Sequence, residues 1–157
     1  SRPAKSDSTM AIYANLEVFK ATDDLLLFVF QFTPNVKRDY RYTLAEKVKD
    51  NIIELCLCIY RANAAKDRVP DIRQARERLV TVKLMCRMLT DLKQISVRQF
   101  AVVCTHTESI SKQLQAWQKY SERQRSDSGS AAAGTRSRSS KATSAALASV
   151  VPPAATD

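Results

Sequence analysis

The chain contains 157 residues, a length that suits one domain with a modest hydrophobic core. Its two glycines, Gly129 and Gly134, lie near the C-terminus, and within residues 11–120 the only prolines are Pro34 and Pro70. So few breakers exclude a turn-rich β protein and favour helices. The net charge is +9, and residues 11–120 carry 18 Lys and Arg against 12 Asp and Glu. The part of the chain that is expected to fold is therefore basic, and this charge either favours an anionic partner or serves solubility alone.

The first helix is predicted to begin near Thr9, after a polar leader of residues 1–8. Its apolar residues recur at three- and four-residue steps and then cover nearly the whole circumference over Leu25–Phe30, which requires contacts on more than one side. Pro34 ends this helix because the residue before a proline avoids the α region. The apolar run is too short to span a bilayer, so we expect a soluble, cytoplasmic protein without membrane contact.

The second helix is predicted to begin at Thr43, where Thr43 and Glu46 have the spacing of a capping box. In such a box each side chain bonds the main-chain amide of the other residue. The helix is expected to fade over residues 63–66. One apolar face follows from the three- and four-residue spacing of Leu44, Val48, Ile52, Leu55, Ile59 and Ala62.

The third helix is predicted to start around Pro70, which suits a first turn, and to run to about Leu92. Its apolar residues step 3-4-3-4-3, the spacing of a bundle seam: Ile72, Ala75, Leu79, Val82, Cys86 and Leu89. Ser96 and Gln99 form a second capping box, so a fourth helix follows after a short turn. Its apolar set is Phe100, Val103, Thr107, Ile110, Leu114 and Trp117.

Short connections make consecutive helices antiparallel. The sequence therefore predicts an all-α fold, an antiparallel up-down-up-down four-helix bundle over residues 9–125. Residues 126–157 are rich in Ser and Ala and contain no aromatic residue, so we expect a disordered basic tail that either touches nucleic acid weakly or stays inert.

The residues that could carry catalysis or bind a metal do not converge. Cys56 and Cys58 are two apart on a helix and point to different sides, and the same holds for Cys104 and the single histidine, His106. A nucleophile–base pair needs side chains that meet at one point. We expect reduced, buried thiols and a protein that is not an enzyme, with no metal, no cofactor and no small-molecule substrate.

Basic residues are the better candidates for a binding site. On the third predicted helix, Arg73, Arg76, Lys83 and Arg87 fall within an arc of about 80°. They are either a stripe that follows a nucleic-acid backbone or a solvated face.

A second group of basic residues precedes the second predicted helix. Lys37, Arg38 and Arg41 alternate with Tyr40 and Tyr42, which suits phosphate contact with base stacking. The same mixture equally suits a helix start in which Tyr42 packs beside the first turn and the arginine stems cover apolar surface.

Three segments carry a family resemblance: "RYTLAEKVKDNIIEL" from Arg41, "ANAAKDRVPDIRQARERL" from Ala62, and the closing "LQAW". Over residues 11–121 the chain resembles the small bacterial four-helix-bundle family that includes the 23S rRNA intervening-sequence proteins. Within it, "NIIEL" in place of the Asn-Ile-Ala-Glu-Gly segment is closer to the accessory variability determinants of diversity-generating retroelements.

This resemblance implies a ring-like homopentamer with a positively charged surface. It also implies a non-enzymatic accessory role, in which the protein associates with the retroelement reverse transcriptase and with RNA or DNA during mutagenic copying. The alternative is a structural or protein-interaction oligomer of the same family without a retroelement role.

Overall fold

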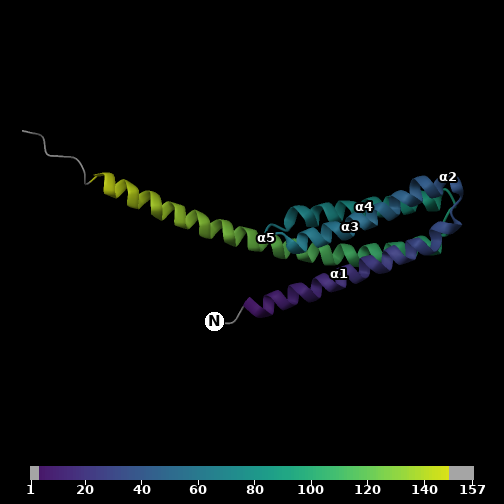
Figure 1. Ribbon diagram of the computed structural model, residues 1–157, viewed down its shortest axis with the longest axis horizontal. Coiled ribbons are helices and arrows are strands. Elements are labelled where there is room, and N and C mark those ends of the chain that lie inside the picture. The colour runs from purple at the N-terminus through teal and green to yellow at the C-terminus, as the bar shows by residue number, and fades with distance from the viewer. Residues whose placement is uncertain (1–3, 149–157) are drawn as a thin grey trace, which may run out of the picture. The chain divides into compact units, whose positions relative to one another are not determined.

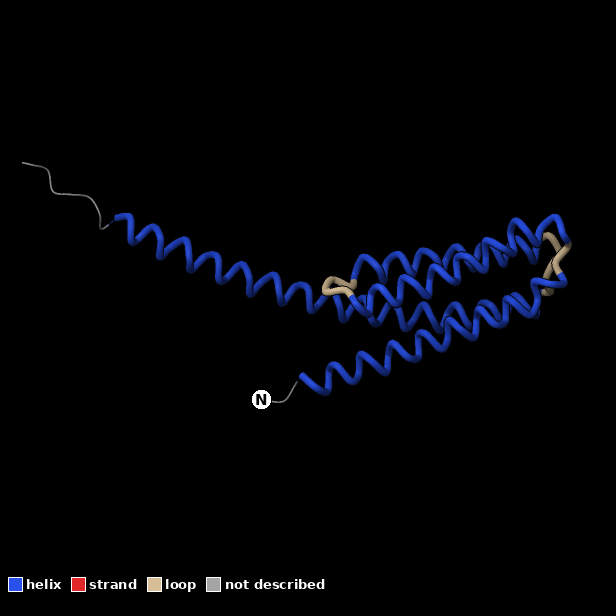
Figure 2. The backbone as a smooth tube through the Cα atoms, in the orientation of Figure 1, coloured by secondary structure: helices blue, strands red, loops and turns tan. Residues whose placement is uncertain are grey.

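A computed structural model describes the backbone of residues 4–148 and the side chains of residues 17–132. Within these residues the chain is helical and contains no strand (Figures 1 and 2). The long helices are α1 (Ala4–Phe32), α3 (Glu46–Ala64), α4 (Val69–Asp91) and α5 (Val97–Ala148); η1 (Thr33–Asn35), α2 (Arg38–Tyr40) and η2 (Arg41–Ala45) form the connection between α1 and α3. None of the helices in this part of the chain is both long enough and apolar enough to cross a membrane.

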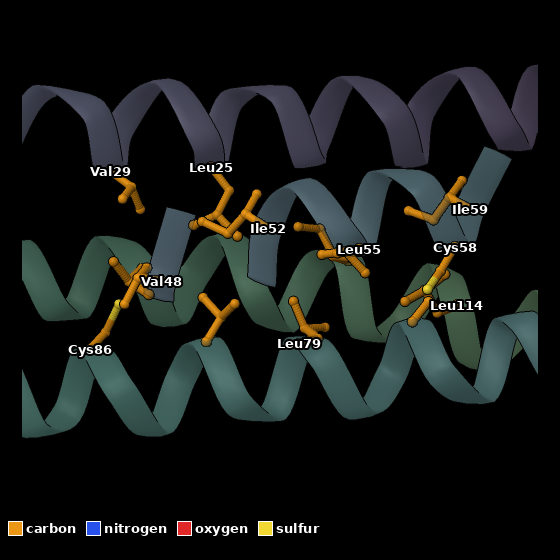
Figure 3. Close-up of a cluster of buried hydrophobic side chains, with 14 of the residues drawn as sticks. Leu25, Val29, Val48, Ile52, Leu55, Cys58, Ile59, Leu79, Cys86 and Leu114 are labelled. Atoms are coloured by element: carbon orange, nitrogen blue, oxygen red, sulfur yellow. The ribbon is translucent and has the colours of Figure 1, made fainter. Parts of the chain in front are cut away.

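The four long helices form the predicted antiparallel bundle. Side chains from all of them meet in one core, where Leu25 of α1, Ile52 of α3, Leu79 of α4 and Leu114 of α5 are buried (Figure 3). The predicted seam of α4 is confirmed, because all six of its residues are buried. Burial of each large aliphatic side chain contributes about 1.5–3 kcal/mol, so this seam contributes to the stability of the bundle together with the buried residues of the other helices.

The first helix differs from its prediction in two respects. It begins at Ala4, five residues before Thr9, and no Gly or Pro interrupts it before its end. The apolar side chains over Leu25–Phe30 are only partly buried, since Leu25 and Val29 are buried whereas Phe30 is half exposed. The side chains of residues 9–16 lie outside the described residues.

The predicted capping box at Thr43 is wrong. The helix begins at Arg38, with the amide of Arg41 bonded to the Lys37 carbonyl at 2.9 Å, and passes through the π turn η2 directly into α3. Thr43 therefore lies inside a helix, where its hydroxyl donates to the carbonyl of Asp39 at 3.0 Å. The local Thr–Glu signature was overridden by contacts that hold the preceding loop.

The capping box at Ser96 is confirmed. The Ser96 amide donates to Gln99 Oε1 at 2.9 Å, and the Gln99 amide donates to Ser96 Oγ at 3.0 Å. These reciprocal bonds satisfy two of the free amides at the start of α5. They fix the first turn of α5.

The last helix continues through the region for which the sequence predicts a disordered tail. Its helical backbone extends to Ala148, and residues 149–157 lie outside the described residues. Contacts divide the chain into a bundle unit, Ser1–Ser121, and a second unit, Glu122–Asp157. Side chains 123–132 are all exposed, so this part of α5 contributes nothing to the core.

Candidate nucleic-acid interface

Two loops meet at one end of the bundle. The connection from α1 to α3 and the connection from α4 to α5 lie at the same end, whereas the α3–α4 loop lies at the other (Figure 2). Gln94 joins the two, because its Oε1 accepts from the Lys37 amide at 2.9 Å while its Nε2 donates to the Leu92 carbonyl at 3.0 Å. One side chain thus sets the spacing of both loops.

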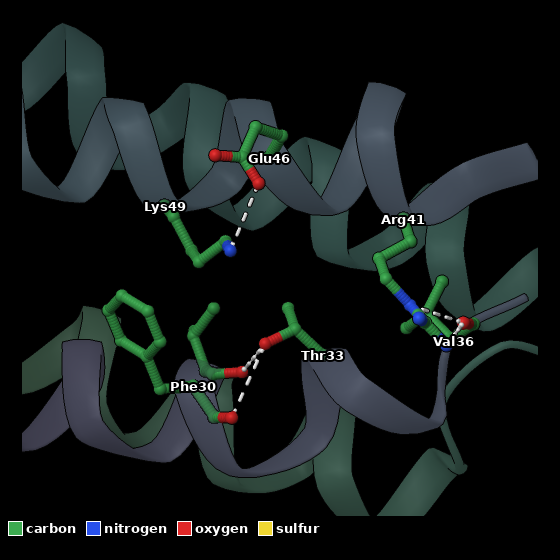
Figure 4. A network of polar contacts seen from close by, with 7 residues as sticks. Phe30, Thr33, Val36, Arg41, Glu46 and Lys49 are labelled. Atoms are coloured by element: carbon green, nitrogen blue, oxygen red, sulfur yellow. Dashed lines mark hydrogen bonds and ion pairs between the residues drawn. The ribbon is translucent and has the colours of Figure 1, made fainter. Parts of the chain in front are cut away.

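Arg41 braces the first loop from inside. Its Nε donates to the Val36 carbonyl at 3.1 Å, and its Nη2 donates to the carbonyls of Val36 at 3.0 Å and Pro34 at 2.8 Å (Figure 4). The Val36 side chain is fully buried beneath this contact. The structure therefore gives Arg41 a structural role, whereas the sequence placed it among the ligand-binding candidates.

Lys37 and Arg38 are exposed at this end, and two further cations that the sequence analysis missed stand with them. Lys93 and Arg98 are exposed on the α4–α5 side. Residues 33–45 and 90–99 together hold five Lys and Arg against two Asp. We call Lys37, Arg38, Lys93 and Arg98 the basic end. The topology could have indicated it, since the first and third connections of an up-down-up-down bundle share an end.

Lys93 has a backbone conformation that disfavours lysine. Its φ is 58°, and it is the one non-glycine residue with positive φ in residues 4–148. It occupies the position after the helix C-cap, with its amide bonded to the Thr90 carbonyl at 2.9 Å and the Gln94 amide bonded to the Leu89 carbonyl at 2.8 Å. Glycine usually takes this position in a Schellman motif.

Three of the four cations predicted as a stripe on α4 are exposed, and the fourth is not. Arg76 is half-buried and turned towards α5, where its Nη1 donates to Gln118 Oε1 at 2.8 Å. Arg73, Lys83 and Arg87 are exposed. Between and beyond them the exposed surface of α4 carries acidic and apolar side chains, namely Glu77, Val80, Leu84, Met88 and Asp91.

A second exposed surface lies along α1 and α3 and is largely apolar. It includes Phe30 of α1 and, on α3, Ile53, Leu57 and Tyr60. The Lys49 ammonium lies 5.1 Å from the centre of the Phe30 ring and pairs with Glu46 at 3.0 Å (Figure 4). Apolar side chains left exposed in such a row indicate a contact surface.

The cysteines and the histidine are embedded in packing. Burial raises the pKa of Cys86 to about 12 and, together with the charge of Asp23, that of Cys56 to about 11. Cys58 is buried and accepts a contact from Arg61 Nη2 at 3.3 Å, and His106 packs against Phe28 with ring centres 6.1 Å apart. No group of three His, Cys, Asp or Glu side chains that could hold a metal occurs in the described part of the chain.

Comparison with known proteins shows a similarity of fold. No family model and no curated protein sequence matches the chain. Among solved structures, the chain is similar to a protein of unknown function from the S23 ribosomal protein family of Bacteroides thetaiotaomicron VPI-5482, with a TM-score of 0.61. The two are 14% identical, and the match covers 68% of this chain and 98% of the other.

Proposed function

We propose that this protein is a non-enzymatic, cytoplasmic accessory protein that binds RNA or DNA through the basic end of its bundle. The resemblance of its sequence to accessory proteins of diversity-generating retroelements extends the proposal to a reverse transcriptase partner and a homopentameric ring. The likeness of its fold to an S23 ribosomal family protein supports the family part of this proposal.

The observation that carries the proposal is the lysine at position 93. A left-handed conformation costs a residue with a side chain about 1–2 kcal/mol, a cost that glycine avoids. The protein keeps a cation at this position, on the exposed turn that Gln94 joins to Lys37. Strained backbone conformations cluster at binding and catalytic sites, which favours a binding role for this turn.

The basic end suits phosphate groups in particular. Its four cations lie in or next to the two connections that share this end, which suits contact with several phosphates of one strand. The helix that begins at Arg38 and α5, which begins at Val97, both direct their N-terminal ends here. The positive ends of their dipoles add to the attraction for anions. These contacts are to the backbone, so they favour little base specificity.

Replacement of Lys93 by Gly separates binding from stability. K93G is expected to raise the melting temperature by about 4 °C, because it removes about 1 kcal/mol of strain from a bundle of this size. The same variant is expected to weaken binding to a labelled single-stranded RNA and to lower the slope of log K against log salt by about 0.7.

Fluorescence anisotropy over a salt series measures the affinity, and thermal unfolding followed by circular dichroism measures stability. Lys112, exposed on α5 away from the two loops, provides the matched control K112Q, which should bind as the wild type does. An unchanged affinity and salt slope in K93G would show that the basic end does not bind nucleic acid.

The reverse transcriptase partnership needs its own test. The purified protein is expected to co-elute with the reverse transcriptase of its own retroelement in size-exclusion chromatography. Separate elution at low salt contradicts this part of the proposal and leaves nucleic-acid binding in place.

The second candidate function is a structural oligomer, which the exposed apolar surface of Phe30, Ile53, Leu57 and Tyr60 favours. Leu57→Glu, which places a charge on that apolar surface, distinguishes the candidates when nucleic-acid binding and mass are both measured. Dissociation of the oligomer supports the second function, and an intact oligomer contradicts it.

A further inference from the structure

The outer surface of α4 carries a heptad pattern that the bundle does not use. Six exposed residues follow one another at steps of 4-3-4-3-4, namely Arg73, Glu77, Val80, Leu84, Arg87 and Asp91. At 100° per residue this outer stripe is centred about 150° away from the buried seam of the same helix. Val80 and Leu84, at its middle, are 59% and 56% exposed, and Met88 beside them is 51% exposed. A helix in a bundle needs one apolar face, and α4 carries in addition a short exposed apolar patch on its outer side.

The order of charges along the outer stripe is self-complementary. Read from Arg73 to Asp91, it runs positive, negative, apolar, apolar, positive, negative. When two copies of α4 are laid antiparallel about Val82, Val80 lies opposite Leu84 of the second copy and Glu77 lies opposite Arg87 of the second copy. The ends of the stripe then pair in the same way, with Arg73 opposite Asp91 of the second copy.

The parallel arrangement fails on the same residues. There Glu77 would meet its own copy and Arg87 would meet its own copy, and like charges placed directly opposite are strongly unfavourable. Steps of 4-3-4-3 are also the spacing that keeps a stripe facing a partner helix over several turns. An isologous contact, in which one patch meets itself about a two-fold axis, has these properties.

We propose that two copies of this chain associate through α4, as an antiparallel helix pair about a two-fold axis near Val82. The centre of the contact is apolar, with Val80 and Leu84 from each copy, and Met88 extends it on one side. Two Glu77–Arg87 pairs flank the centre. Arg73 and Arg87 are then residues of a protein interface rather than of a nucleic-acid surface.

The pair would place the basic ends of its two copies at opposite ends of the paired α4 helices. Lys93 lies 11 residues beyond the two-fold axis, so the two copies of this residue are separated by about 33 Å along the helices at 1.5 Å per residue. A nucleic acid long enough to reach both ends would bind more tightly than one that reaches a single end. This consequence rests on the proposed function, whereas the pairing itself does not.

Charge exchange tests the pairing in its stated register. Glu77→Arg alone places two arginines opposite each other, and Arg87→Glu alone places two glutamates opposite each other. Each single variant is expected to lower the association constant at least about tenfold, because like charges across an interface cost more than the 1.4 kcal/mol that corresponds to tenfold. The double variant E77R/R87E restores opposite charges and should associate like the wild type.

The two single variants should also associate with each other when mixed, because each supplies the charge that the other needs. Sedimentation velocity over a concentration series measures the association, and circular dichroism checks that each variant keeps its helix content. Glu108 and Lys112 lie on the exposed surface of α5, and E108R with K112E gives a matched charge exchange that should not change association.

The pairing is overturned if the single variants associate as the wild type does. It is also overturned if the folded double variant and the mixture of the two single variants fail to associate as the wild type does. Nucleic-acid affinity of K93G is measured separately, so failure of the pairing and failure of the proposed function are distinguishable.

Discussion

Replacement of Arg41 by Lys is expected to destabilise the bundle although it keeps the charge. The guanidinium reaches the Val36 and Pro34 carbonyls with three contacts of 2.8–3.1 Å from two of its nitrogens. An ammonium group donates from a single nitrogen and cannot reproduce that fork. The carbonyl of Val36 would lose both of its contacts from Arg41.

The expected loss follows from the geometry. Hydrogen bonds from a charged donor contribute about 1.5–3 kcal/mol. Because Arg41 is half-buried, water can bond to the carbonyls that R41K leaves without a partner, which reduces the loss. We therefore expect R41K to lower the free energy of unfolding by about 1–2 kcal/mol, which corresponds to about 4–8 °C in melting temperature for a unit of this size.

Urea denaturation of R41K, beside R38K as a matched neighbour, measures this effect. Arg38 is exposed at the start of α2, so R38K should unfold as the wild type does. A site that used Arg41 only to bind nucleic acid would behave differently, because R41K would then lose affinity without losing stability. A wild-type unfolding midpoint in R41K would refute the assignment of Arg41 as the brace of this loop.

Ser96→Ala removes one of the reciprocal bonds at the start of α5 and is expected to cost about 1 kcal/mol, measured by urea denaturation; an unchanged midpoint would show that the box is dispensable. Cys86 has a pKa raised by burial from about 9 to about 12, so its thiol ionises in the unfolded chain at a lower pH than in the folded one. The stability linked to Cys86 is therefore fully present below pH 9 and is lost as the pH rises from 9 towards 12, which thermal unfolding over this range should show as a falling melting temperature. The same burial predicts that a thiol reagent at pH 8 modifies Cys86 only as fast as the bundle opens, and rapid modification of the native protein would contradict it.

Helical periodicity predicted the fold well because it reports a physical requirement. The seam of α4 has to be apolar at every inward position, so its six residues identify both the helix and its buried face. The box at Ser96 was predictable for a similar reason, since both partners lie within one turn. The box at Thr43 was not, because Arg41 and Gln94 hold the preceding loop and start the helix earlier.

The candidate site was only partly predictable. Lys37 and Arg38 were found from local composition, but Lys93 and Arg98 become their neighbours only through the bundle topology. The spacing along α4 groups Arg76 with the other three cations, but spacing alone could not show that Arg76 donates to Gln118 of α5. Periodicity places a residue on a helix, and the packing of neighbouring helices decides what that residue meets.

The bond between Lys37 and Gln94 has a consequence for the order of folding. Its two residues are 57 positions apart, whereas most contacts of a helical hairpin are local. We expect the α3–α4 hairpin to form early and this link to form late, once both loops have arrived at the same end. Interactions absent from the folding transition state act mainly by slowing unfolding. A ligand held by Lys37 and Lys93 together should therefore lengthen the lifetime of the native state and leave its rate of formation nearly unchanged.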